Sequence, residues 1–168
     1  MQNVLIRIIN ITQFNSEQQK FRGDKIFREH GGGVSVFSED CARVKSNNCI
    51  CCHAEDNYYS TTDHLPYILW KINVEDLKSY VKPDTVIFDT DTPSTIPNKK
   101  DGTYDECHVD IQKISDERRE EFANKFCKPP FIFICVDNDE VQIDEPTFRN
   151  LKTWTKEQGY FKKKGRLL

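Results

Sequence analysis

The feature that most constrains the fold is a series of short apolar segments rich in β-branched and aromatic residues. They read NVLIRIINIT at 3–12, LPYILWKI at 65–72, TVIFDTDTP at 85–93, CHVDIQKI at 107–114 and PPFIFICV at 129–136. Residues of these types favour β-strands. The connections between them are mostly too short or too irregular to be the crossover helices that parallel strands need. The sequence therefore predicts an α+β fold with a mainly antiparallel sheet.

A few helices should flank this sheet. Asn73 and Ser115 can each cap a helix, because their side chains can accept hydrogen bonds from unpaired backbone N–H groups. In the last part of the chain, Phe148, Leu151 and Trp154 recur along one face at helical spacing. Helices are accordingly expected over 74–80, 116–126 and 145–159.

Length and charge limit the organisation of the chain. A chain of 168 residues can build one hydrophobic core, and no repeat marks a second unit, so we expect a single domain over 1–168. Residues 43–63 show no clear period and predict an irregular excursion. The net charge of −3 gives no general attraction to nucleic acid. Only a local contact is expected, through a basic tail at 160–168 that contains Lys162, Lys163, Lys164 and Arg166.

Two further features bear on the compartment. No apolar run is long enough to cross a membrane, and the N-terminus lacks the basic start and cleavage site of a signal peptide. The chain has seven cysteines, an odd number, and Cys51 and Cys52 are adjacent, which suits reduced thiols better than a disulfide framework. We therefore expect a cytoplasmic protein with no membrane contact.

The cysteine-rich segment also raises the question of a metal. Cys41, Cys49, Cys51, Cys52 and His53 include the ligand types that zinc favours. Structural zinc sites use pairs of cysteines two to four residues apart, and only one such pair is found here. Buried free thiols are the alternative, and we expect reduced thiols without stoichiometric zinc.

Three consecutive glycines precede one of the expected strands. Gly31 to Gly33 are three of only seven glycines, and each costs more backbone entropy on folding than any other residue. Bare backbone beside a strand lets a ligand approach closely, so Gly32 and Gly33 are candidates for a ligand-binding wall. A bulged turn is the alternative interpretation.

Other polar residues also lie where expected strands begin. Arg22 could neutralise a phosphate with a bidentate contact. Ser35, His64 and His108 each lie at or near the start of a strand. Together with the glycines they predict a nucleotide-binding cleft, unless the histidines are ordinary residues of strand ends.

The order of these elements resembles a known superfamily. An early Arg-Gly, the segment GGVSVF at 32–37 and HVDI at 108–111 before an acidic helix are similar to a loose group of small bacterial proteins. That group resembles compact members of the ADP-ribosyltransferase and RNA 2′-phosphotransferase superfamily, some of which are toxins. The resemblance covers roughly 21–126.

The resemblance implies a split β-sheet whose cleft holds NAD. The superfamily lines this cleft with an arginine or histidine on an early strand, a serine-containing strand and a later polar residue. By position, Arg22 would contact phosphate or ribose, and Ser35 and His108 would be the catalytic residues. The chain departs from the family in lacking a Glu-x-Glu or Gln-x-Glu pair, for which Glu106-Cys107-His108 is a rough substitute.

Two functions follow as hypotheses. The first is a transferase that acts on NAD or on a nucleic-acid end, as a bacterial toxin or defence effector. The second is a non-enzymatic interaction module, such as an immunity or adaptor protein, whose partner binds the excursion at 43–63.

Overall fold

The computed structural model describes residues 3–27, 34–58, 64–80, 87–89, 105–112 and 114–163. Their main feature is a seven-stranded sheet in which all neighbouring strands are antiparallel. Its order is β10 (Asp139–Gln142), β9 (Ile132–Val136), β6 (Ile68–Asn73), β1 (Val4–Ile9), β4 (Val34–Ser38), β8 (His108–Gln112) and β7 (Ile87–Asp89). The predicted α+β fold with a mainly antiparallel sheet is confirmed.

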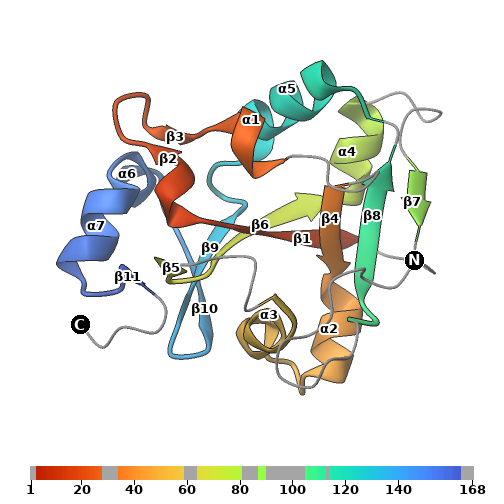
Figure 1. Ribbon diagram of the computed structural model, residues 1–168, viewed down its shortest axis with the longest axis horizontal. Coiled ribbons are helices and arrows are strands. Elements are labelled where there is room, and N and C mark those ends of the chain that lie inside the picture. Colours follow the sequence, from red (N-terminus) through yellow and green to blue (C-terminus); the bar gives the residue numbers. More distant parts are fainter. Residues whose placement is uncertain are drawn as a thin grey trace.

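The sheet narrows at the junction between β1 and β4. β1 pairs with β6 along its whole length, from Val4 to Ile9, but it pairs with β4 only at Leu5 and Ile6. Figure 1 shows β4 and β8 running across the direction of β1 rather than alongside it. The sheet is therefore continuous, and its two parts diverge at the junction between β1 and β4.

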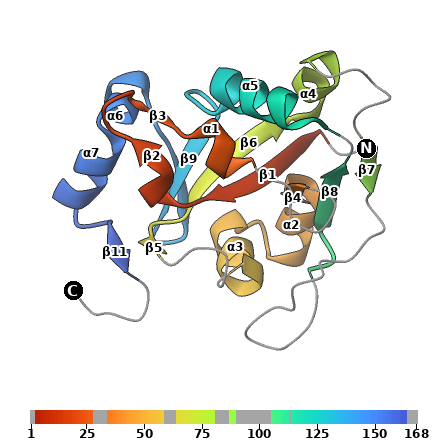
Figure 2. The ribbon, with the colours of Figure 1, turned by 45° about the horizontal axis from the view of Figure 1, so that its top comes forward.

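Helices cover both faces of the sheet. One face carries α1 (Gly23–Ile26), α4 (Val74–Tyr80) and α5 (Asp116–Phe126), and the other carries α2 (Glu39–Lys45) and α3 (Ile50–Tyr58) (Figure 2). The remaining elements are η1 (Ile11–Gln13), β2 (Phe14–Asn15), β3 (Lys20–Phe21), β5 (His64–Leu65), α6 (Glu145–Arg149), α7 (Leu151–Glu157) and β11 (Lys162–Lys163). No helix in the described ranges is both long enough and apolar enough to span a bilayer.

Strand alternation divides the core between these faces. In β1, Leu5 and Ile9 belong to the larger cluster under α4 and α5, whereas Ile6 belongs to the smaller cluster under α2 and α3. The larger cluster is dominated by aromatic rings: Trp70 lies edge-on to Phe27, with their centroids 5.1 Å apart. Such pairs add to the stabilisation that burial provides.

The expected irregular excursion at 43–63 is wrong, because α2 covers its start and α3 its middle. Ser38 caps α2 by accepting a hydrogen bond from the Cys41 N–H at 3.3 Å. Asn47 and Asn48, with φ of 50° and 65°, then turn the chain into α3. The helical period of α3 was not recognised in the sequence, because cysteine and histidine supply part of its buried face.

The end of the chain differs from the prediction in its closing helix, which is divided at Asn150, where φ is −116°, into α6 and α7. At the start of the predicted basic tail, the backbone of Lys162 and Lys163 pairs with β5 as the strand β11. Residues 164–168, which include Lys164 and Arg166, lie outside the described residues.

The expectation of reduced thiols is also wrong. Six of the seven cysteines form the disulfides Cys41–Cys107, Cys49–Cys52 and Cys51–Cys135. Cys127 has a free thiol, and burial raises its pKa well above the ordinary value. Two of the disulfides join residues 66 and 84 positions apart, so no local spacing rule could have found them.

Candidate functional site

The structure brings Ser35 and His108 together. Pairing of β4 with β8 places Ser35 opposite Asp110 and Phe37 opposite His108, so the four side chains share one face. Ser35 Oγ lies 2.7 Å from His108 Nε2, which in turn lies 3.2 Å from Asp110 Oδ1. A hydroxyl, an imidazole and a carboxylate therefore meet on adjacent strands, with the histidine buried.

Arg7 is the cation that the structure adds to this group. Its Nη1 donates to the carbonyl oxygen of Ser35 at 2.6 Å, and its Nε donates to the carbonyl oxygen of Ile26 at 3.0 Å. The guanidinium thus lies at the junction where β1 and β4 part. No carboxylate within the described residues pairs with this guanidinium. Burial lowers the pKa of Arg7 to about 10.

Arg7 was not among the predicted site residues, and Arg22 was the predicted phosphate contact. The available signal was a single arginine inside the apolar segment VLIRII, since charged residues are rarely placed in a buried strand without a reason. Arg22 stands at the start of α1 with an exposed side chain, 3.4 Å from Asp24. It lines a cavity of about 300 Å³ that neither Ser35 nor His108 lines.

Of the other predicted ligand-binding residues, only His64 belongs to the described backbone. It begins β5, which pairs with β11 in a separate two-stranded sheet. Gly32 and Gly33 lie outside the described residues.

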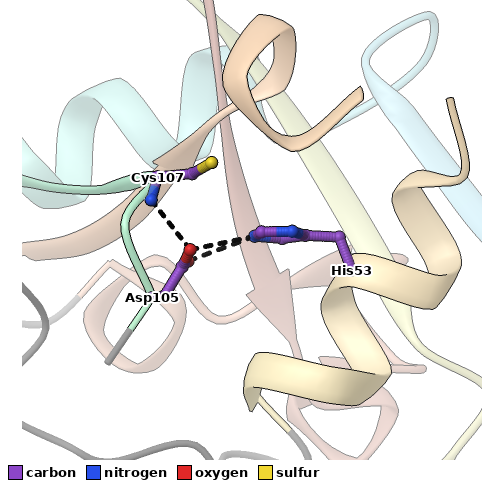
Figure 3. Close-up of side chains that lie close together, drawn as sticks. All are labelled: His53, Asp105 and Cys107. Carbon is purple, nitrogen blue, oxygen red and sulfur yellow. Dashed lines mark hydrogen bonds and ion pairs between the residues drawn. The ribbon is translucent and has the colours of Figure 1, made fainter. Parts of the chain in front are cut away.

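A second buried cluster lies beside the first on the same face. His53 of α3 approaches Asp105 with its Nε2 at 3.2 Å, and the Cys107 N–H donates to the same carboxylate at 2.8 Å (Figure 3). The Tyr58 hydroxyl also donates to Asp105. Phe37 connects the two clusters, because it packs against both His53 and Tyr58 with ring centroids 4.9 and 5.1 Å away.

The electrostatics of this second cluster centre on Asp105. Burial acts to raise the pKa of the carboxyl, but the hydrogen bonds from His53, Tyr58 and the Cys107 N–H outweigh it, and the pKa is lowered. For Tyr58, burial and the neighbouring carboxylate raise the pKa well above its ordinary value. Asp105 is therefore held as an anion among donors, in a loop where the sequence showed only polar residues.

A third group of charges is internally balanced. Arg43 lies 2.6 Å from Glu39 and 3.0 Å from Glu140, and Lys71 lies 3.0 and 2.7 Å from the same two carboxylates. Two cations and two anions thus neutralise one another between α2, β6 and β10. The charges of this network therefore compensate one another, whereas no carboxylate in the described ranges pairs with Arg7.

Arg7 and the Ser35–His108 pair bring two kinds of chemical group to this part of the sheet. The guanidinium, which contacts β4 at the Ser35 carbonyl oxygen, supplies fixed positive charge, and an imidazole beside a hydroxyl is a pair of groups that can take part in proton transfer. No family model, curated protein or solved structure matches the chain.

Proposed function

We propose that the protein is a transferase of the ADP-ribosyltransferase type, with NAD as its substrate and with Arg7, Ser35 and His108 in its site. The observation that carries the proposal is the charge of Arg7, with which no carboxylate among the described residues pairs, next to the Ser35–His108 pair. The resemblance implied an arginine on an early strand, a serine on a second strand and a later polar residue. Arg7 on β1 fits that description better than Arg22, which precedes α1.

The charge of Arg7 points to an anionic ligand. Burying a cation is costly unless an opposite charge or a full set of hydrogen bonds compensates it. Arg43 and Lys71 meet this condition through carboxylates, whereas Arg7 contacts two neutral carbonyl oxygens. The pyrophosphate of a dinucleotide would supply the missing charge, since guanidinium binds phosphate oxygens in a bidentate manner.

The chemistry assigned to His108 is the removal of a proton. In the transfer, the bond between the ribose anomeric carbon and the nicotinamide nitrogen breaks, and its electron pair leaves with nicotinamide. An acceptor hydroxyl or amine forms the new bond to that carbon and gives its proton to Ser35 Oγ, while the Ser35 hydroxyl proton passes to His108 Nε2, 2.7 Å away. The Nε2–H formed in this step lies 3.2 Å from Asp110 Oδ1, to which it can donate.

The biological role proposed with this activity is that of a cytoplasmic bacterial toxin or defence effector. An interaction module without catalysis is the competing role. The two roles differ in whether NAD is consumed.

Nicotinamide release is the test. Purified protein is incubated with millimolar NAD, and free nicotinamide is measured by chromatography. We expect release that falls at least tenfold in Arg7→Lys, which keeps the charge but loses the planar fork, and in His108→Ala. The matched control Arg22→Lys should retain full activity, because this exposed side chain lies outside the site.

Three outcomes would count against the proposal. No release by the wild-type protein would favour the interaction module. Equal release by Arg7→Lys would remove Arg7 from the site. Release that requires an RNA with a 2′-phosphate would assign the site to a nucleic-acid end.

A further inference from the structure

We infer that Cys41, Cys107, His53 and Asp105 form a zinc site when the Cys41–Cys107 disulfide is reduced. The inference is independent of the proposed transferase activity, because it concerns the neighbouring cluster. It rests on three buried ligand-bearing side chains, His53, Asp105 and Cys107, whose ligand atoms lie close together, and on the half-buried Cys41 of α2, which is bonded to Cys107.

The distances suit one tetrahedral ion. The ligand atoms of His53, Asp105 and Cys107 all lie within 4.8 Å of one another (Figure 3). Ligand atoms bound to zinc at 2.0–2.3 Å are about 3.3 to 3.8 Å apart in a tetrahedron. His53 Nε2 and the Asp105 carboxylate are 3.2 Å apart, so they need little movement to bind the same ion.

Cys41 supplies the fourth ligand. Its sulfur is bonded to that of Cys107, and the two Cα atoms are 5.5 Å apart. Two sulfurs that share a bond need only rotate apart to coordinate one ion. A set of two thiolates, one imidazole and one carboxylate leaves no open position, which is typical of a structural rather than a catalytic zinc site.

The surrounding hydrogen bonds already orient these ligands. Ser46 Oγ lies 3.0 Å from His53 Nδ1, which leaves Nε2 to face the cluster. Tyr58 and the Cys107 N–H hold the Asp105 carboxylate. Zinc ligands are commonly fixed in this way by partners on their far side.

The change from the disulfide to the zinc-bound form takes two steps, reduction and metal binding. A dithiol reductant gives two electrons and two protons to the Cys41–Cys107 bond and is itself oxidised to a disulfide. Zn²⁺ then replaces the two thiol protons, which are released to solvent. Because cytoplasmic thiols are kept reduced, the zinc form would be the resident one if the protein is cytoplasmic.

Metal titration of the reduced and oxidised protein tests the site. The full chain is reduced with a phosphine, titrated with Zn²⁺ and then with Co²⁺, and compared with untreated protein. We expect one zinc per reduced chain, a sulfur-to-cobalt charge-transfer band and a higher melting temperature with zinc. The oxidised protein should bind none at this site.

Matched variants separate this site from the other cysteines. Cys49→Ser with Cys52→Ser removes the only other pair at zinc-like spacing and should leave the stoichiometry at one. Cys41→Ser removes one thiolate, so it should weaken zinc binding at least tenfold and lower the intensity of the sulfur-to-cobalt charge-transfer band. His53→Gln should also weaken zinc binding at least tenfold and lower the intensity of this band. If binding persists in Cys41→Ser and is lost in the Cys49, Cys52 variant, or if the folded reduced chain binds no zinc, the inference is wrong.

Discussion

At the scale of single residues, the charges of Asp105 and Arg7 are balanced in different ways within the described part of the molecule. Asp105 accepts hydrogen bonds from His53, Tyr58 and the Cys107 N–H, so its charge is stabilised by the protein alone. Arg7 donates only to carbonyl oxygens among its described contacts. The first charge is explained by the fold, and the second points to a ligand.

The charge of Asp105 should make stability depend on pH. Its pKa is lower in the folded protein than in the unfolded chain, so its stabilisation is complete above about pH 5 and is lost as the pH falls through the folded value. We expect Asp105→Asn to cost about 1–3 kcal/mol at neutral pH, because the buried donors lose a charged acceptor. The free energy of unfolding of this variant should also fall less steeply than that of the wild type below pH 5.

Urea unfolding from pH 7 to pH 3 measures both effects. Asp139→Asn, a substitution at an exposed side chain of β10, is the control and should follow the wild type. Parallel curves for wild type and Asp105→Asn would show that the three donors do not stabilise the anion.

Sequence patterns could predict some residues of the candidate site but not others. Ser35 and His108 were predicted to meet, because each lies on a segment with strand alternation. Arg7 was missed, because an apolar run of six residues looks like a fully buried strand, and nothing in the sequence says that β1 and β4 part beside it. Asp105 was missed because its donors come from α3, about 50 residues earlier.

At the scale of elements, helices with a clear apolar period and a capping residue were predicted almost to the residue. α4 follows Asn73, whose side chain accepts from the Glu75 and Asp76 N–H groups, and α5 follows Ser115. α2 and α3 were not predicted, because their inner face is built partly from Cys51 and His53, which an apolar pattern does not count. Long-range disulfides then hold this face to the sheet.

The contact between α1 and α5 gives a prediction at this scale. A Cβ added at Gly23 would lie 2.8 Å from Asn124 Oδ1 and 3.0 Å from the Glu120 carbonyl oxygen, both in α5. Gly23→Ala should therefore cost about 1–3 kcal/mol of stability, since the backbone oxygen cannot move aside cheaply. Chemical denaturation of the variant gives the value.

A double variant separates the two contacts. Adding Asn124→Ala removes the flexible neighbour but leaves the Glu120 oxygen in place, so it should restore only part of the loss. Wild-type stability in Gly23→Ala alone would mean that α1 does not lie this close to α5.

At the scale of the whole molecule, covalent links join the two layers. Cys41–Cys107 ties α2 to the start of β8, and Cys51–Cys135 ties α3 to β9. Closing loops of 66 and 84 residues restricts the unfolded chain and is worth about 4 kcal/mol each in the chain-entropy model. The helical layer that carries His53 is thereby fixed beside the strands that carry Ser35 and His108.

The central proposal, that the junction of β1 and β4 binds NAD through Arg7, is tested most directly by thermal unfolding with and without NAD. A ligand at about a hundredfold excess over its dissociation constant stabilises the folded state by roughly 2.7 kcal/mol. Wild-type protein should show a rise in melting temperature that grows with NAD concentration, Arg22→Lys should show the same rise, and Arg7→Lys should show little or none. A wild-type melting temperature that millimolar NAD does not change, or an equal rise in Arg7→Lys, would contradict the proposal.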